Sequence, residues 1–332
     1  MRNFFSRVIE KEISLSVLAC FICLPLLVQD AGQADKEALA KAAADLRVRI
    51  EATPTLPFNG VHFAAKPPAI GWESGAVSWV AVDGKGRIYE IQRGEKADPV
   101  LVLDREAKIL RSWGKGDYKI PHSIRIDPTG KVCTVDAGSS TVIKYSPLGE
   151  KLMTITVGEQ PENGSSFNGT TDVAFAPNGH IFITDGYGNA RVLEYTPDGK
   201  REKQWGKSGA GPGEFRLPHA IQIDEKGAVY VADRENGRIE KFDLDGHFLG
   251  EIPHLGRIHS LKLVGGVLWA GTGPFNQPPG SSAWVLKLDR NTGKLLGHID
   301  VPEPRGAHSI EQMPSGEPLI TLGNELLWFK AK

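Results

Sequence analysis

The sequence predicts an all-β protein, a six-bladed β-propeller, and two observations support this prediction. The chain of 332 residues contains 38 glycines and 22 prolines, a higher share than the average protein has, which favours many turns between short strands. From Val77 onward one pattern recurs six times: an apolar strand, a turn with glycine, a second strand that often ends near aspartate, and a third strand. Repeats of ~40 to 50 residues with this pattern are typical of four-stranded propeller blades.

The first 34 residues are predicted to be a secretory signal peptide. Three basic residues precede an apolar run, Leu15–Val28, and the small residues Ala31 and Ala34 offer a cleavage site. The run is shorter than the ~20 residues that cross a bilayer. We therefore expect an exported chain, periplasmic or extracellular, with no stable membrane span. An uncleaved anchor and lipid modification at Cys20 remain as alternatives.

The mature chain is predicted to begin with a short helix and linker, residues 35–56, ahead of the propeller at 57–332. The stretch Asp35–Glu51 is rich in strong helix formers. Cys20 and Cys23 leave with the signal peptide, so Cys133 is the single cysteine of the mature chain. No intrachain disulfide can form, and the exported protein must rely on its apolar core.

The six repeats align on one apolar residue of the first strand. These residues are Val80, Ile124, Val173, Ile221, Leu261 and Ile310. They lie 40 to 49 residues apart. Third strands such as VIKYSPLG alternate apolar and polar residues, as half-buried strands do. The last repeat ends near its third strand, so an upstream segment around Val61–Ile70 is expected to supply the fourth strand and close the ring.

The charge balance argues against a polyanionic partner. The chain has 39 basic and 40 acidic residues, which gives a net charge of -1. A protein that binds nucleic acid through phosphate contacts usually carries an excess of lysine and arginine. We therefore expect no nucleic-acid partner, and a search for function turns to the propeller axis.

Four histidines share one position of the repeat. The residues two places before the aligned apolar positions are Ser78, His122, Thr171, His219, His259 and His308. The first strand of each blade lines the axis, so these residues meet in a ring. Alternate blades of a six-fold ring are related by about 120°, so the histidines of blades two, four and six can direct three imidazoles at one point and leave one position open, as in a catalytic zinc site. His259 remains a fourth ligand, a neighbour of the ligands or a polar channel residue.

A simpler interpretation is that each histidine caps a blade through backbone hydrogen bonds. The shared position and the alternation around the ring favour metal binding. Three loop residues support a site at the same end of the channel: Tyr187 in DGYGNAR, Arg234 in ADRENGR, and Arg93 in IQRG. The alternative for Arg234 and Arg238 is pairing with neighbouring acidic residues.

Blade four carries the G-x-F-x-x-P and Y-V-A-D motifs of NHL-type repeats, and blade three is close to them. Together with PHSI, DGYGNAR, QWG and ADRENGRI, these motifs resemble the peptidyl-α-hydroxyglycine α-amidating lyase family over about Val77–Lys330. The family fold is a six-bladed propeller. The resemblance implies a lyase that cleaves the N–C bond of a peptidyl or N-acyl α-hydroxyglycine to give a primary amide and glyoxylate.

The resemblance also implies a role for each residue of the ring. The zinc ligands would be His122, His219 and His308. Tyr187 would be the catalytic base, and near two arginines and a dication we expect it to ionise more easily than at its free pKa of ~10. Arg93 and Arg234 would bind the carboxylate and carbonyl groups of the substrate.

A structural calcium ion is also implied by the resemblance, held partly by the backbone carbonyls of Val80 and Ile124. The acidic ligand of the family would follow the last histidine, where this chain has Ser309. A neutral hydroxyl is a poor substitute for a carboxylate, which argues against calcium.

Two other functions remain open at this point. One is an NHL-type propeller that binds a protein or a small ligand and catalyses nothing. The other is a calcium-dependent hydrolase of the lactonase type, because six-bladed propellers host more than one chemistry. Such a hydrolase would need axial Asp, Glu and Asn ligands, whereas this ring offers histidines. Metal analysis of the purified protein would separate the three functions.

Overall fold

The computed structural model describes residues 41–161, 165–273, 283–301 and 306–332. The predicted signal peptide, Cys20, Cys23 and the start of the predicted helix lie outside these residues. Residues 41–51 are helical, which confirms that part of the predicted helix. Within the described residues, no helix has both the length and the apolar character needed to cross a membrane. Contacts divide the chain into two units, Met1–Val48 and Arg49–Lys332, and the second unit is the propeller.

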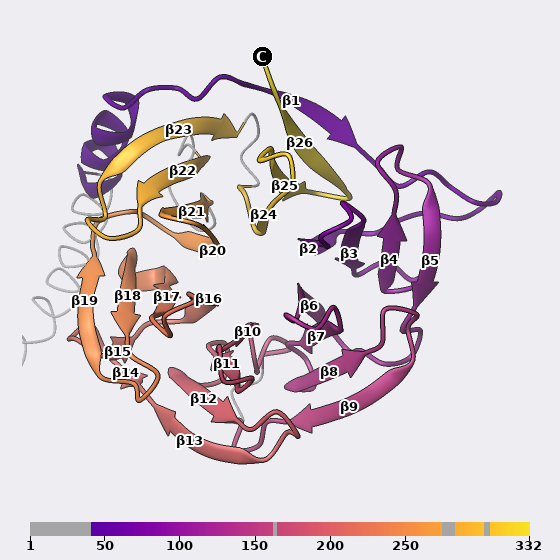
Figure 1. Cartoon of the computed structure of the whole chain (residues 1–332), viewed down its shortest axis with the longest axis horizontal. Helices are drawn as coiled ribbons and strands as arrows, with labels where there is room; N and C mark the ends of the chain where they lie inside the picture. The colour runs from indigo at the N-terminus through magenta and orange to yellow at the C-terminus, as the bar shows by residue number, and fades with distance from the viewer. Residues whose placement is uncertain (1–40, 162–164, 274–282, 302–305) are drawn as a thin grey trace, which may run out of the picture. The chain divides into compact units, whose positions relative to one another are not determined.

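Six four-stranded antiparallel sheets surround a central axis, which confirms the predicted fold (Figure 1). Blade one comprises β2 (Val77–Val82), β3 (Ile88–Gln92), β4 (Val100–Leu103) and β5 (Ile109–Trp113). Blade two comprises β6 (Pro121–Ile126), β7 (Val132–Asp136), β8 (Thr141–Tyr145) and β9 (Lys151–Thr156). Blade three comprises β10 (Asp172–Phe175), β11 (Ile181–Asp185), β12 (Arg191–Tyr195) and β13 (Arg201–Trp205).

The other three blades follow the same order from the axis outward. Blade four comprises β16 (Pro218–Ile223), β17 (Val229–Asp233), β18 (Arg238–Phe242) and β19 (Phe248–Ile252). Blade five comprises β20 (Ile258–Val264), β21 (Val267–Thr272), β22 (Ala283–Asp289) and β23 (Leu295–Val301). Blade six contains β24 (Ile310–Gln312), β25 (Pro318–Leu322) and β26 (Glu325–Ala331). A short parallel pair, β14 (Lys207–Ser208) and β15 (Glu214–Phe215), precedes blade four.

An upstream strand completes blade six, as the sequence predicted. β1 (Phe58–Phe63) pairs antiparallel with β26, from Phe58 opposite Ala331 to Phe63 opposite Leu326. The strand begins earlier than the expected start at Val61 and ends well before Ile70. The partner strand β26 begins at Glu325, so the ladder ends there, and Pro67 and Pro68 could not donate to any continuation of it. Pairing of β1 with β26 joins the first and the last strand of the propeller, which closes the ring and gives blade six its fourth strand.

The strand register confirms the alignment of the six repeats. Each aligned apolar residue of an inner strand pairs with the same position of the second strand, for example Val80 with Glu90 and Ile221 with Val231. All six aligned residues are buried. Apolar clusters fill the spaces between neighbouring blades; Val135 of blade two, for instance, belongs to one cluster with Val173 of blade three. Burial of this surface, at about 25 cal/mol per Å², is the main stabilising contribution to the ring.

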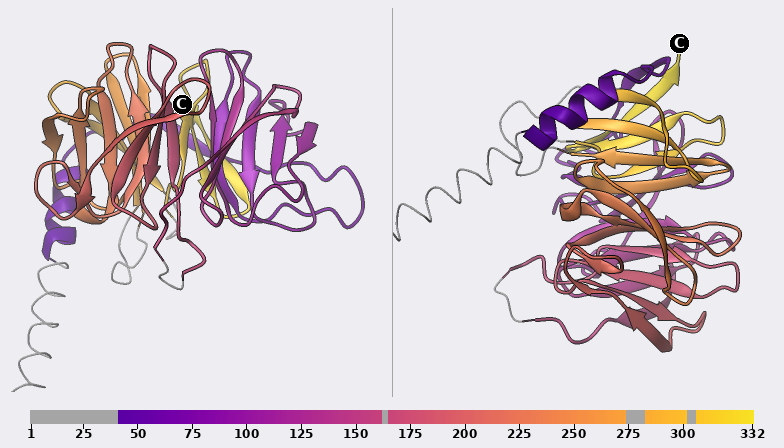
Figure 2. Two further views of the ribbon diagram at one scale, coloured as in Figure 1. Left: turned by 90° about the horizontal axis from the view of Figure 1, so that it is seen from below. Right: turned by 90° about the vertical axis from the view of Figure 1, so that its left-hand side faces the viewer.

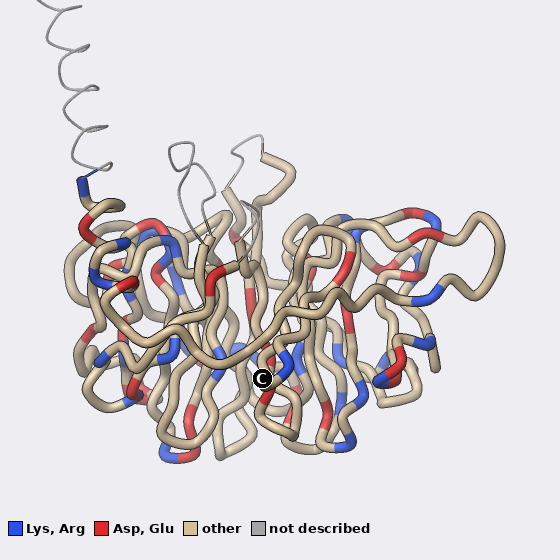
Figure 3. Tube along the Cα trace, turned by 90° about the horizontal axis from the view of Figure 1, so that it is seen from above, with Lys and Arg blue, Asp and Glu red and all other residues tan. Residues whose placement is uncertain are grey.

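The side views show that the blades stand around the axis with loops at both ends (Figure 2). The loops that follow the second strand of each blade lie at the end where the inner strands begin. Lysine and arginine are interspersed with aspartate and glutamate over the ring (Figure 3), in line with the net charge of -1. Whether a residue lies at the start or at the end of its strand therefore decides which end of the channel its side chain reaches.

Candidate metal centre

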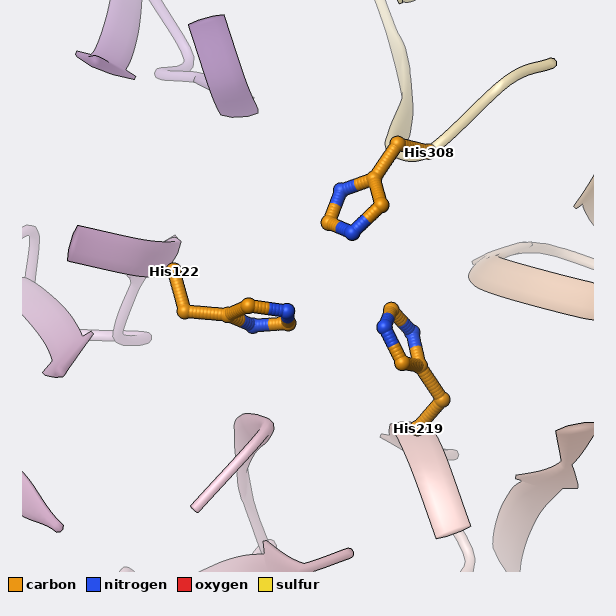
Figure 4. Close-up of side chains that lie close together, drawn as sticks. All are labelled: His122, His219 and His308. Carbon is orange, nitrogen blue, oxygen red and sulfur yellow. The ribbon is translucent and has the colours of Figure 1, made fainter. Parts of the chain in front are cut away.

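Three histidines from alternate blades direct their imidazoles at one point of the axis (Figure 4). His122 and His219 are the second residues of β6 and β16, and His308 lies two residues before β24. One ligand nitrogen from each ring lies within 4.8 Å of the other two, and the ring centroids are 5.0 to 5.1 Å apart. The structure therefore brings together the three residues that the sequence predicted.

The outer nitrogen of each imidazole is bound to the neighbouring blade. Nδ1 of His122 donates to the Thr171 carbonyl at 2.6 Å, and Nδ1 of His219 donates to the His259 carbonyl at 2.6 Å. Nδ1 of His308 donates to the Ser78 carbonyl at 2.8 Å. These bonds assign the proton to Nδ1 and leave the Nε2 lone pair for a ligand. The backbone cap and the metal site, treated as alternatives in the sequence, are thus compatible, because each uses a different nitrogen.

The environment keeps these imidazoles neutral. Burial lowers the pKa of His122 and His219 well below the ordinary value, and neighbouring positive charge on Arg93 or Arg234 adds to this effect. Burial, again with help from Arg93, lowers the pKa of His308 to about 3. A metal ion binds neutral imidazole, so no proton has to leave before binding. Three neutral imidazoles that converge on one point fit Zn²⁺.

His259 shares the repeat position of the three ligands but lies outside the cluster. Its ring centroid is 5.3 Å from that of His219 and 5.6 Å from that of His308. The group of nitrogens within 4.8 Å of one another contains no atom of His259. Blade five lies between two blades that each supply a ligand, so its histidine approaches the axis beside the convergence point. Of the roles left open for His259, the geometry favours a polar neighbour of the ligands.

Tyr187 lies on the loop between β11 and β12 and reaches the cluster. Its hydroxyl lies 3.0 Å from Nε2 of His122 and 3.0 Å from Nε2 of His219. Burial raises the pKa of Tyr187, and the guanidiniums of Arg234 and Arg93 only partly oppose this increase. The arginines alone therefore do not give the easier ionisation that we expected from the sequence. Positive charge at the histidines would be needed as well.

Arg93 and Arg234 reach the same end of the channel, each just after the second strand of its blade. Arg93 donates from Nε to the Pro121 carbonyl at 2.9 Å and from Nη2 to the Ser78 hydroxyl at 2.7 Å. Arg234, in the short 3-10 helix Arg234–Asn236, lies with its guanidinium carbon 5.8 Å from the centre of the Tyr187 ring. Both predicted arginines are thus next to the cluster.

Two arginines of blade four, Arg234 and Arg238, also form the ion pairs with neighbouring acidic residues that the sequence left open as an alternative. Arg238 pairs with Asp233 at 2.9 Å, and Arg234 pairs with Glu235 at 2.8 Å. Arg238 is a structural residue, because its buried guanidinium also donates to a carboxylate of the same blade and to two backbone carbonyls of the β14–β15 segment before that blade. Arg234 differs, because it combines its ion pair with a position over the tyrosine ring.

Sequence reasoning missed two residues of the site. Trp79 is fully buried, and its ring centroid lies 5.6 to 6.2 Å from those of the three histidines. It directly follows Ser78 of the ring position, so the alignment itself could have revealed it. Arg257, just before β20, binds Glu235, the partner of Arg234. No repeat pattern marks Arg257.

The residues named for calcium do not fit that ion. The Ser309 hydroxyl accepts a hydrogen bond from the Val80 amide at 3.1 Å, and a hydroxyl is neutral in any case. Next to Ile124, the buried guanidinium of Arg125 makes two hydrogen bonds to Asp172, at 3.0 and 2.6 Å. Asp172 is thus already neutralised by Arg125, and Ser309 brings no negative charge, so these residues offer no free carboxylate to a calcium ion.

Comparisons with known proteins agree with the fold and the motifs. A protein family described as a 6-bladed beta-propeller matches residues 168–256. The peptidyl-glycine alpha-amidating monooxygenase of Mus musculus is 32% identical over 286 residues, which cover 75% of this chain and 29% of that protein. The probable peptidyl-alpha-hydroxyglycine alpha-amidating lyase of Caenorhabditis elegans is 32% identical over 197 residues, 51% of this chain and 56% of that protein.

Among solved structures, a streptogramin B lyase superposes with a TM-score of 0.58 and 16% identity, over 83% of this chain and 98% of that chain. At this identity the likeness concerns the fold alone. The chain spans less than two thirds of the length of either curated relative. The six-bladed fold and the names of these relatives support the resemblance to the peptidyl-α-hydroxyglycine α-amidating lyase family.

Proposed function

We propose that the protein is a zinc-dependent lyase that cleaves the N–C bond of a peptidyl or N-acyl α-hydroxyglycine and releases a primary amide and glyoxylate. One observation carries this proposal: one imidazole nitrogen from each of three histidines lies within 4.8 Å of the other two, and the Tyr187 hydroxyl lies 3.0 Å from Nε2 of His122 and of His219. The names of the relatives support the reaction class. The predicted signal peptide would place the activity outside the cytoplasm.

His122, His219 and His308 would hold the zinc ion through Nε2. Their Nδ1 hydrogen bonds to backbone carbonyls fix the orientation of each ring, so little reorganisation is needed on binding. The same hydrogen bonds raise the basicity of Nε2. When bound, zinc supplies a Lewis acid that lowers the pKa of a coordinated hydroxyl group. Three histidine ligands would leave a coordination position for the substrate, as in catalytic zinc sites.

Tyr187 is the group best placed to accept the proton of the substrate hydroxyl. In the reaction this O–H proton leaves, the carbonyl of glyoxylate forms, the N–C bond breaks and the amide nitrogen takes up a proton. The phenol oxygen lies at the histidine cluster, within hydrogen-bond distance of two imidazoles. Positive charge on Arg234 and Arg93 stabilises the phenolate against the cost of burial. After accepting the proton, Tyr187 can return it to the departing nitrogen.

The reaction can be tested with zinc-loaded wild-type protein and N-benzoyl-α-hydroxyglycine. We expect glyoxylate to form faster than in the spontaneous breakdown of the carbinolamide, which gives the same products and has to be subtracted. Tyr187→Phe keeps the size of the ring and removes the hydroxyl, so its zinc content should be unchanged while turnover falls by ~100-fold or more, the usual contribution of a general base. Zinc-loaded protein that gives no glyoxylate above background with several acyl groups would refute the lyase function and favour a propeller that only binds.

A further inference from the structure

Arg257 is a third buried arginine at the histidine end of the channel. Its side chain is 10% exposed, and its Nη2 donates a hydrogen bond to Oε1 of Glu235. Its Nε and Nη1 are buried and have no hydrogen-bond partner among the residues that the structure describes. A buried guanidinium with two unsatisfied donors is unfavourable unless a ligand accepts from them. Arg257 therefore has the character of a binding group rather than a structural one.

The contacts of Arg257 place it at the candidate site. Oε1 of Glu235, its partner, also accepts from Nε of Arg234 at 2.8 Å, and Arg234 lies over the Tyr187 ring. The charge of Arg257 is one of those that oppose the effect of burial on the pKa of Tyr187. The same charge adds to burial in lowering the pKa of His259. Arg257 thus lies within electrostatic reach of both Tyr187 and His259.

The charges around Arg234 and Arg257 do not balance. These two guanidiniums share one carboxylate, that of Glu235. That pair therefore keeps one net positive charge. Arg93 instead donates to two neutral acceptors, a backbone carbonyl and a serine hydroxyl. A ligand with one negative charge and two oxygen acceptors would satisfy the pair of arginines that shares Glu235.

We propose that Arg257 and Arg234 together bind the carboxylate of the substrate, and that Arg93 binds a neutral oxygen of the same molecule. The inference rests on the proposed lyase function, because it takes the free carboxylate of α-hydroxyglycine as the ligand. Guanidinium groups hold carboxylates in a fixed, often forked geometry. The site then selects substrates with a free carboxylate and rejects esters that lack the charge.

Kinetics with a charged and an uncharged substrate test this assignment. The pair is N-benzoyl-α-hydroxyglycine and its methyl ester, which differ in the negative charge. For Arg257→Ala we expect kcat/KM with the acid to fall by ~10- to 100-fold, the usual effect of losing a hydrogen bond to a charged group, mainly through KM. With the ester we expect a clearly smaller loss, because the ester offers no carboxylate to Arg257. Equal losses on acid and ester, or no loss on either, would overturn the assignment.

Two further variants guard against a merely structural effect. Arg257→Lys keeps the charge beside Glu235 but cannot form the fork, so its loss on the acid should be smaller than that of Arg257→Ala; a lysine variant that loses acid and ester equally would contradict the proposal. Arg290→Ala is the matched control, because the Arg290 side chain is also 10% exposed and is paired with Glu225. Its kinetics should equal those of wild type with both substrates.

Equilibrium binding of glyoxylate separates this inference from the proposed reaction. Glyoxylate carries the same carboxylate, so calorimetry should show at least ~10-fold weaker binding to Arg257→Ala than to the wild type. Equal affinity, or no binding to the wild type, would overturn the role of Arg257. Absence of lyase turnover in a wild type that binds glyoxylate through Arg257 would count against the reaction and leave the carboxylate site in place.

Discussion

Replacing Glu90, a buried carboxyl group on β3, should stabilise the protein. Glu90 is 1% exposed, and neither of its carboxyl oxygens has a hydrogen-bond partner among the described residues. Burial raises the pKa of this carboxyl to about 8. The same register position holds Ile183, Val231 and Ile320 in blades three, four and six. An apolar side chain therefore suits the position. Glu90→Met keeps the length of the side chain while removing the carboxyl group.

The size and the pH dependence of the effect follow from the two pKa values. Near neutral pH the Glu90 carboxyl is protonated in the folded chain and ionised in the unfolded chain, where its pKa is 4.5. Unfolding then releases a proton, so the free energy of unfolding falls as the pH rises from 4.5 towards 8, by ~1.4 kcal/mol per pH unit. The loss accumulated at about pH 7 is ~3 kcal/mol. Glu90→Met and Glu90→Gln both remove this loss, because neither side chain ionises.

Urea unfolding followed by tryptophan fluorescence, at about pH 5 and about pH 8, measures the effect. The free energy of unfolding of Glu90→Met should exceed that of the wild type near pH 8, and the difference should shrink near pH 5. Glu90→Gln keeps a polar group and so separates the effect of ionisation from that of polarity. It should lose the part of the pH dependence that Glu90 causes. It should gain less stability than Glu90→Met, since a buried amide also lacks hydrogen-bond partners. A difference between wild type and Glu90→Met that is the same at both pH values would refute the reasoning.

Two predictions concern the metal content of the protein. Elemental analysis should find one zinc per chain in the wild type and none in His219→Ala. His259→Ala is the matched control, because His259 lies outside the cluster, and it should keep its zinc. Zinc retained by His219→Ala would contradict the ligand set. Removal of calcium with a selective chelator should leave the melting temperature nearly unchanged, whereas Arg125→Ala should lower it because Asp172 is left as an uncompensated buried charge. A large loss of stability on chelation, reversed by calcium alone, would show that a calcium site exists.

The repeat made the fold and the metal ligands predictable from the sequence. One aligned inner-strand residue per blade fixes the register of a propeller. In a closed ring, residues that share one repeat position therefore lie close together around the axis. His122, His219 and His308 follow from that geometry. The same rule could not tell that His259 would lie beside the point of convergence, because the rule gives the level along the axis and not the direction of the imidazole.

The arginines show where sequence reasoning ends. Arg93 and Arg234 were found because each follows the second strand of its blade and because the family motif includes them. Arg257 lies four residues before the aligned Leu261, and no other blade has a charged residue at that position. Its importance comes from a contact with Glu235, which belongs to the preceding blade. A contact between two loops has no period, so only the structure could reveal it.

Trp79 is the one large side chain at its repeat position, and it contacts both the histidines and a buried arginine. The equivalent residues in the other blades are Ser123, Asp172, Ala220, Ser260 and Ser309. Its indole contacts the three histidines, and the guanidinium of Arg125, further along the inner strand of blade two, lies 5.0 Å from the same indole. Trp79 thus connects two parts of the axis: the histidines, and the Arg125–Asp172 pair, whose two hydrogen bonds join the inner strands of blades two and three.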